Sequence, residues 1–201
     1  DKYNVMFMIE GTVMSGTPVL NLTSGPLAGC RISSAKGILN GTTNYILSEM
    51  EYGMEYKDAL KKAQELGYAE ADPTGDVEGY DARAKVTILA NVVMGVPCLL
   101  NEVSCDGISA ITADDIQNAQ KNNSRWKLIG NVEINDGTLT ASVKPEMIAL
   151  THPLAGIMGP TNAVTFSTDL LGEITIVGAG AGKIETGFSI LSDLLEIHRL
   201  S

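Results

Sequence analysis

The sequence predicts an α+β fold, in which helices cover one face of a mixed or antiparallel sheet. Two alternating runs around the dipeptide Asp136-Gly137 have the pattern of a β-hairpin. Two further β-rich runs meet near Gly172, and segments with apolar residues at helical spacing occur in both halves of the chain. No internal repeat or low-complexity linker interrupts this pattern.

The N-terminal elements follow from composition and turn residues. Residues 3–14 are rich in β-forming side chains and predict a strand, with Glu10 near its end. A segment punctuated by Gly and Pro comes next, and a short helix is expected after Pro18. Residues 30–39 predict a second strand.

Two helices are expected after this strand. Over residues 40–53, Asn40 or Thr42 can cap the start of a helix and Gly53 can end it. Residues 54–67 carry apolar side chains at helical spacing and predict an amphipathic helix closed by a glycine.

The middle of the chain predicts a loop followed by a further helix. Residues 68–80 are acidic and are broken by Pro73 and Gly75, which favours a loop. From Asp81 onward the helical period returns and continues to the Gly-Val-Pro triplet that begins at Gly95.

The second half predicts one helix, four strands and a final helix. Residues 111–122 predict a helix with Thr112 as its cap. Residues 126–145 predict the hairpin, residues 163–178 two more strands, and residues 184–200 the closing helix.

Composition excludes several classes of partner. The chain has 201 residues and a net charge of −10, which disfavours binding to nucleic acid or to anionic lipid. No apolar run approaches the roughly 20 residues that span a bilayer, and no signal peptide is recognised. The three cysteines form no C-x-x-C pair, so neither a disulfide framework nor a zinc site is predicted. Reduced thiols in the cytoplasm are expected.

An acidic cluster beside a lysine is the clearest functional signal. Glu70, Asp76 and Asp81 lie within twelve positions, and Lys85 follows Asp81 by one helical turn. Carboxylates that converge at a helix start can bind the ammonium and hydroxyl groups of a small polar substrate. A lysine among them can transfer a proton to or from an oxygen. A solvated ion pair of small value is the plain alternative.

Three long motifs identify a resemblance to a known family. "GILNGTTNYILSEM", "AQELGYAEADPTGDVEGYDARAKVTILA" and "HPLAGIMGPTNAVTFSTDLLGEITIVGAGAG" occur in the order and spacing of the homoserine dehydrogenase catalytic domain. The resemblance extends from about Glu10 to Asp193. It implies NAD- or NADP-dependent interconversion of L-homoserine and L-aspartate 4-semialdehyde. It also implies that Glu70, Asp76 and Asp81 hold the substrate and that Lys85 is the acid/base.

The glycine-rich segment "VGAGAGK" over residues 177–183 does not fit a dinucleotide fingerprint. Lys183 stands where the third glycine belongs, and fewer than twenty residues follow. A turn used only for packing is one interpretation. The resemblance implies instead that the turn contacts the cofactor, with Gly180 and Gly182 giving the backbone close access.

The segment "MIEGTVMSGTP" over residues 8–18 resembles the family's loop for a monovalent cation. Sodium or potassium would then bind the carboxylate of Glu10 and mainly backbone oxygens of Val13, Ser15 and Thr17, all hard ligands. Met14 and Ser15 stand where the family often has small residues. A charge at a sheet edge is the alternative for Glu10.

The resemblance also implies a domain organisation. Residues 1–180 are expected to form the substrate-binding, catalytic and dimerising part, and residues 181–201 to pack on a nucleotide-binding domain. That domain and the lysine it contributes to the site are not within this sequence. Because the chain begins at Asp1, we expect that it is processed or cut from a longer protein.

A non-catalytic module is the competing hypothesis. In that case the chain keeps the acidic pocket as a stand-alone amino-acid-binding or oligomerisation unit and turns nothing over. In either case the resemblance implies a homodimer formed through the sheet.

Overall fold

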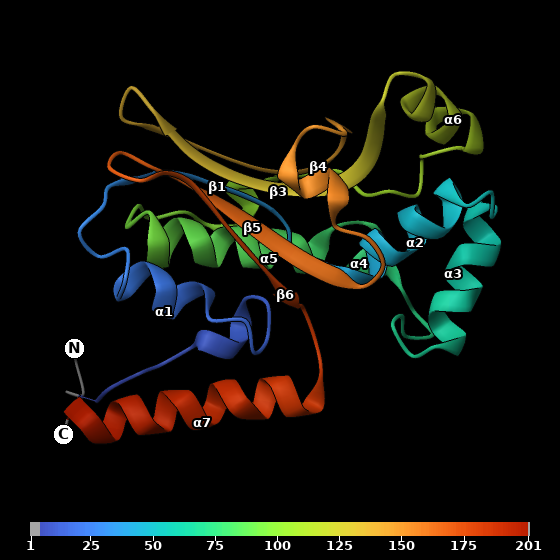
Figure 1. The fold of residues 1–201 in the computed structure, drawn as a ribbon. Coiled ribbons are helices and arrows are strands. Elements are labelled where there is room, and N and C mark those ends of the chain that lie inside the picture. Colours follow the sequence, from blue (N-terminus) through green and yellow to red (C-terminus); the bar gives the residue numbers. More distant parts are fainter. Residues whose placement is uncertain (1–4, 201) are drawn as a thin grey trace.

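The computed structural model describes residues 5–200 and has the predicted α+β architecture (Figure 1). Six strands form one sheet in the order β2-β4-β3-β1-β5-β6. All neighbouring strands are antiparallel except β2 and β4, which are parallel, so the sheet is mixed. The strands are β1 (Ile32–Ile38), β2 (Ser104–Cys105), β3 (Ser124–Asn135), β4 (Thr138–Ala149), β5 (Thr161–Thr168) and β6 (Gly172–Ala179).

Seven α-helices accompany the sheet within the described residues. They are α1 (Val19–Ser24), α2 (Gly41–Glu51), α3 (Tyr56–Glu65), α4 (Thr74–Val77), α5 (Tyr80–Ile88), α6 (Ala113–Lys121) and α7 (Lys183–Leu200). Short 3-10 helices add η1 (Glu10–Thr12), η3 (Leu100–Glu102) and η4 (Pro153–Gly156). No helix in residues 5–200 is both long and apolar enough to cross a membrane.

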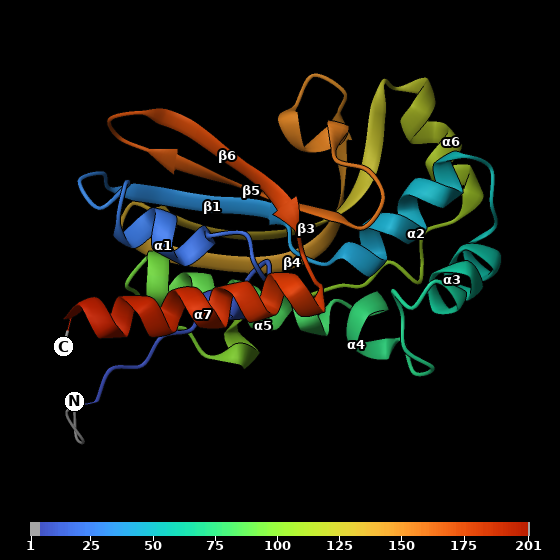
Figure 2. The same ribbon diagram turned by 60° about the horizontal axis from the view of Figure 1, so that its bottom comes forward.

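The main core lies between the sheet and the helices on one of its faces. Val86 and Leu89 pack there with Val132, Val164 and Phe166 of the strands, and all five side chains are buried. Figure 1 shows α1 and α5 on this face and α7 beyond α1, while Figure 2 shows α7 lying lengthwise along the same side. A smaller apolar cluster on the other face is covered by η4.

Local signals explain where several elements begin. Asn40 caps α2, because its Oδ1 accepts the amide hydrogen of Thr43 at 2.9 Å. Thr112 caps α6 and forms a capping box with Asp115. Asp136 and Gly137 form the β3–β4 turn with φ of 50° and 78°, as a two-residue hairpin requires.

The strand predicted over residues 3–14 is wrong. Residues 3 and 4 lie outside the described residues, residues 5–9 have no regular structure, and Glu10 begins the 3-10 helix η1. Phe7 is 84% exposed. A strand needs a partner as well as β-forming residues, and here the edge strands of the sheet are β2 and β6.

The loop predicted over residues 68–80 contains the short helix α4. Four residues are too few for a helical period to be recognised in the sequence. The next helix has the predicted extent, but its last turn, Leu89–Val93, is a π-helix rather than an α-helix.

Candidate active site

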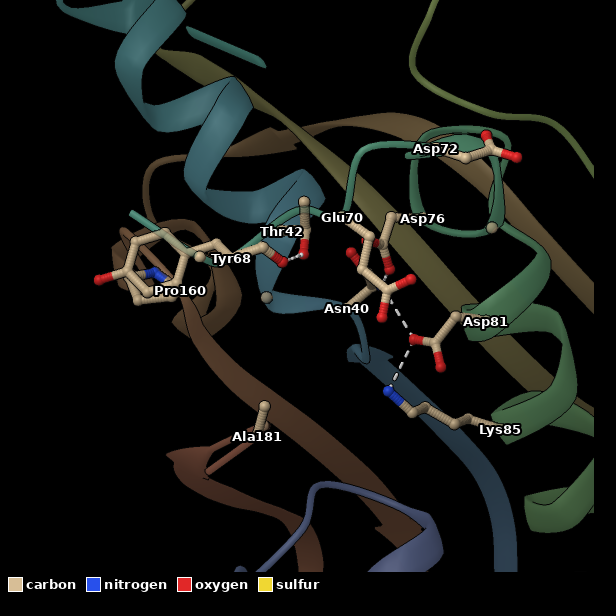
Figure 3. Close-up of a pocket in the computed structure, with 14 residues that line it drawn as sticks. Asn40, Thr42, Tyr68, Glu70, Asp72, Asp76, Asp81, Lys85, Pro160 and Ala181 are labelled. Atoms are coloured by element: carbon tan, nitrogen blue, oxygen red, sulfur yellow. Dashed lines mark hydrogen bonds and ion pairs between the residues drawn. The ribbon is translucent and has the colours of Figure 1, made fainter. Parts of the chain in front are cut away.

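A pocket of about 440 Å³ opens where the start of α2, the segment between α3 and α5, and the turn after β6 meet (Figure 3). These three regions are far apart in the sequence and are brought together by one end of the sheet. The pocket is lined by Asn40, Gly41, Thr42, Gly67, Tyr68, Glu70, Asp72, Gly75, Asp76, Asp81, Lys85, Pro160, Gly180 and Ala181.

Helix α5 carries the lysine into this pocket. Lys85 Nζ lies 2.7 Å from Asp81 Oδ2, one turn earlier on the same helix, and donates to the carbonyl oxygen of Leu39 at 2.8 Å. The Lys85 side chain is only 14% exposed, so water screens this pair less than it would a surface pair. The lysine therefore has one fixed charged partner and one fixed carbonyl partner.

Asn40 joins the acidic residues to helix α2. While its Oδ1 caps the helix, its Nδ2 donates to Asp76 Oδ1 at 2.7 Å and to Asp81 Oδ2 at 2.9 Å. Burial raises the pKa of Asp76, the bond from Asn40 lowers it, and the neighbouring Asp81 charge raises it again. The amide thus separates two carboxylates that would otherwise repel one another.

The other acidic residues of the segment divide into two groups. Glu70 is exposed and points into the pocket beside Asp76 and Asp81 (Figure 3). Asp72 instead accepts hydrogen bonds from the backbone and hydroxyl of Thr74, and Figure 3 shows it turned away from the other three. Glu78 accepts a bond from Ser109. Of the predicted cluster, Glu70, Asp76, Asp81 and Lys85 are brought together.

A second hollow of about 800 Å³ adjoins the first, and four residues line both: Asp81, Lys85, Gly180 and Ala181. Gly182 and the start of α7 line only the second. Gly180 must be glycine, because a Cβ there would overlap the carboxamide of Asn162. Of the two glycines predicted to meet a cofactor, Gly180 lies at the junction of the hollows and Gly182 lines the second hollow, while Lys85 lines both hollows.

The predicted cation loop is folded around Glu10. The buried carboxylate accepts amide hydrogens from Leu20 at 3.0 Å and Asn21 at 2.6 Å, which caps α1. The Ser15 carbonyl accepts the Ser189 hydroxyl, and Thr17 Oγ1 donates to Ala179. Val13 is fully buried in the same loop. Of the oxygens invoked for an ion, the Glu10 carboxylate and the carbonyls of Ser15 and Thr17 thus already have protein partners, although a carbonyl can accept a second contact.

Sodium or potassium at this loop stays a prediction. Its expected signature is a melting temperature that rises with NaCl or KCl more than with choline chloride at equal ionic strength. Equal responses to the three salts, measured by differential scanning calorimetry, would leave Glu10 as a helix cap alone. No group of three or more His, Cys, Asp and Glu side chains in residues 5–200 is placed to hold a metal ion.

Several residues of the pocket wall were not predicted as site residues, among them Asn40, Thr42, Tyr68 and Pro160. Asn40 and Thr42 were expected only as helix caps, whereas Thr42 lies inside α2 and donates its hydroxyl to the Tyr68 carbonyl at 2.7 Å. Tyr68 and Pro160 complete this side of the pocket. The cap pattern locates Asn40, but its contacts with the acidic residues depend on tertiary packing.

Lys127 is a second lysine, and its position inside the fold was not predicted from the sequence. It is fully buried on β3, where Nζ donates to Asn44 Oδ1 at 2.9 Å and to the Ile157 carbonyl at 2.6 Å. Burial lowers its pKa to about 8, against the opposing charge of Glu51. Asn44 also donates to the backbone of Ile157 and Gly159, so the two side chains hold the segment that carries Pro160 to the pocket.

Comparison with known proteins gives a consistent result. The family model described as homoserine dehydrogenase matches residues 18–195. The NAD(+)-dependent homoserine dehydrogenase of Pseudomonas canavaninivorans is 53% identical over 98% of this chain and 56% of its own length. The homoserine dehydrogenase of Methanocaldococcus jannaschii is 46% identical over 98% of this chain and 57% of its own. The chain therefore spans about half the length of the curated relatives it matches.

Solved structures agree with these relatives. A homoserine dehydrogenase from Thiobacillus denitrificans superposes with a TM-score of 0.93 at 38% identity, covering 96% of this chain and 45% of that one. A hyperthermophilic archaeal homoserine dehydrogenase mutant in complex with NADPH gives a TM-score of 0.80 at 31% identity, covering 96% and 56%.

Proposed function

Because this chain belongs to the homoserine dehydrogenase family, we propose that it is the substrate-binding and catalytic part of an enzyme that interconverts L-homoserine and L-aspartate 4-semialdehyde. The cofactor of the proposed reaction is NAD or NADP. One observation carries the proposal. Lys85 lines both adjoining hollows and has a carboxylate partner, so one lysine can serve a substrate in the first hollow and a nicotinamide in the second.

The smaller hollow has the charges that an α-amino acid requires. Glu70 and Asp76 supply negative charge for a substrate ammonium group. The first turn of α2, at Gly41 and Thr42, lines the same pocket and carries the positive end of the helix dipole, which favours a carboxylate. Asp81 and Lys85 are left for the hydroxyl end of the substrate.

Lys85 is the proton-transfer group of the proposed reaction. In the reducing direction, its ammonium group donates a proton to the aldehyde oxygen as a hydride reaches the adjacent carbon. In the oxidising direction the neutral amine removes the hydroxyl proton. The dinucleotide, when bound, supplies or accepts the hydride. Asp81 holds the ammonium in place, because its Oδ2 accepts a hydrogen bond from Lys85 Nζ at 2.7 Å.

Replacing Glu70 tests the substrate assignment. Glu70→Gln removes a charge from the ammonium-binding side, so L-homoserine should bind this chain about tenfold more weakly by isothermal titration calorimetry, a loss of about 1.4 kcal/mol. The matched control Glu65→Gln removes a carboxylate from α3 outside the pocket and should change nothing. Equal affinities in the wild type and Glu70→Gln would contradict the assignment. Binding without turnover, once a nucleotide-binding domain and NAD(P) are supplied, would favour the non-catalytic module.

We propose the same domain organisation as above, with residues 1–180 forming the substrate part and residues 181–201 docking on a nucleotide-binding domain. Helix α7 supports this proposal because it packs on η1 along one side and leaves apolar residues exposed on the other. Such a surface is typical of an interface. The exposed residues are Ile184, Phe188, Ile190, Leu191, Leu194 and Leu195.

Leu191→Glu should weaken this docking at least tenfold, because it places a charge within the apolar surface of α7. The measurement is the affinity of the variant for a nucleotide-binding domain of the family, supplied as a separate chain. Arg199→Glu makes a larger charge change on the same helix outside the apolar residues and is expected to have little effect. An unaltered affinity in Leu191→Glu would remove α7 from the proposed interface.

A cytoplasmic homodimer without nucleic-acid or membrane partners completes the proposal. The net charge of −10 supports the absence of polyanionic partners. The 3-10 helix η4 packs on the apolar cluster of the sheet face opposite the main core, and in the proposed dimer the second copy contacts the rest of this face. A monomer in light scattering at micromolar concentration would contradict the dimer.

A further inference from the structure

Asn162 has a buried side chain whose polar atoms have no partner. It is fully inaccessible to solvent at the start of β5, and neither Nδ2 nor Oδ1 makes a hydrogen bond. Elsewhere in residues 5–200, Glu51 Oε1 is the one other buried side-chain polar atom in that condition. An unpartnered buried amide costs free energy, so it calls for a compensating role.

The carboxamide of Asn162 lies directly behind the wall of the proposed substrate pocket. A Cβ on Gly180 would overlap it, and a Cβ on Gly41 would come within 3.3 Å of its Oδ1. Gly41 and Gly180 both line the pocket. Two glycines without side chains therefore separate the free amide from the site.

The backbone in front of Asn162 is also the wall between the two hollows. Gly180 and Ala181 line both of them, and residues 180–182 belong to neither a strand nor a helix. Gly180 and Gly182 allow this turn to rotate slightly, and such a rotation can direct a peptide N–H or C=O toward the Asn162 carboxamide. Ligands that fill both hollows contact the turn on both sides.

We propose that Asn162 is a positioning residue that hydrogen-bonds the backbone of residues 180–182 once ligand occupies the site, and so locks the turn beside Lys85. The inference rests on the proposed function, because it assigns the hollows to L-homoserine and the dinucleotide. Without ligand, in the open form of the turn, the hydrogen bonds of the Asn162 carboxamide are unmade, and this destabilises that form. With ligand, in the closed form, the backbone of residues 180–182 makes these hydrogen bonds. Ligand binding therefore shifts the population toward the closed turn.

Two asparagines that are equally buried but differ in their hydrogen bonds give a matched test. Asn44 is also buried, but its amide donates to Ile157 and Gly159 and accepts from Lys127. Asn44→Leu should lower Tm by 5 °C or more, because it leaves several partners unsatisfied. Asn162→Leu has nearly the same shape as asparagine and should keep Tm unchanged or raise it by a few degrees. With a nucleotide-binding domain, NAD(P) and L-homoserine present, Asn162→Leu should nevertheless lose about tenfold or more in kcat, with L-homoserine affinity changed less than threefold.

Hydrogen exchange provides the direct readout. L-homoserine should increase the protection of residues 180–182 in the wild type and leave it unchanged in Asn162→Leu. A Tm loss like that of Asn44→Leu, a wild-type kcat, or equal protection in both proteins would overturn the inference. An inactive wild-type protein would overturn the proposed function instead, and the exchange measurement with L-homoserine would still decide the role of Asn162.

Discussion

Lys85→Met should lower turnover by about 10³-fold when the chain is assayed with a nucleotide-binding domain and NAD(P), while L-homoserine affinity changes by less than tenfold. General acid–base groups contribute roughly 10²–10⁴-fold to the rate, and the structure offers no second ammonium beside Asp81 in the pocket lining. Methionine keeps the aliphatic length of lysine and removes the proton-carrying nitrogen, so the effect should appear in kcat rather than in KM.

The control for this substitution is Lys61→Met. Lys61 is 75% exposed on α3 and pairs with Glu65 outside the pocket, so the same chemical change there should leave kcat intact. A Lys85→Met enzyme with near-normal kcat would show that another group, such as a lysine of the nucleotide-binding domain, transfers the proton.

Alkaline pH is expected to stabilise the fold through Lys127. The folded protein releases the Lys127 proton near pH 8, whereas the unfolded chain keeps it until its ordinary value of 10.5. The unfolded state therefore binds more protons between these values, and the free energy of unfolding rises with pH there. Between pH 7 and pH 10 the titration of Lys127 raises the free energy of unfolding by roughly 2–3 kcal/mol. This corresponds to a rise of about 5–10 °C in Tm for a domain of this size.

The groups that face Lys127 define the controls. Glu51 raises the pKa of the amine and Arg125 lowers it, while Asn44 and Ile157 supply uncharged oxygens. Lys127→Met removes the titrating group, so the difference in stability between it and the wild type should shift by this amount across the pH range. Lys36→Met removes a lysine that pairs with Glu146 on the same sheet. Its free energy of unfolding should change with pH in the same way as that of the wild type. Parallel curves for Lys127→Met would mean that the amine is charged in the fold throughout.

The elements that the sequence predicts well are those determined by neighbouring residues. Thr112 with Asp115, Asn40 with Thr43, and the Asp136-Gly137 turn all act within four positions, so their helices and hairpin can be recognised without the fold. The strand prediction around Glu10 is wrong because the β-forming residues there have no strand to pair with. Local propensity cannot report a missing partner.

The candidate site also has features that local spacing predicts and features that depend on the tertiary fold. Asp81 and Lys85 share a helix face by spacing alone, so their pairing was predictable. The gathering of Asn40, Pro160 and Gly180 around them depends on strand order, which spacing does not encode. Buried Lys127 and Asn162 run against the usual expectation that polar side chains lie at the surface.

The double use of Asn40 narrows the mutational tolerance of that position. Helix capping alone would accept Asp, Ser or Thr. The two bonds that Asn40 Nδ2 donates to Asp76 and Asp81 require an N–H donor, and an aspartate would instead add a third carboxylate within reach of the other two. One side chain must therefore accept one hydrogen bond for the helix and donate two to the site. A serine or threonine hydroxyl accepts but has a single hydrogen to donate, so among the preferred caps only asparagine can make all three bonds. A substitution of Asn40 by another preferred cap would therefore leave helix α2 well formed but would change the hydrogen bonding of Asp76 and Asp81 in the site.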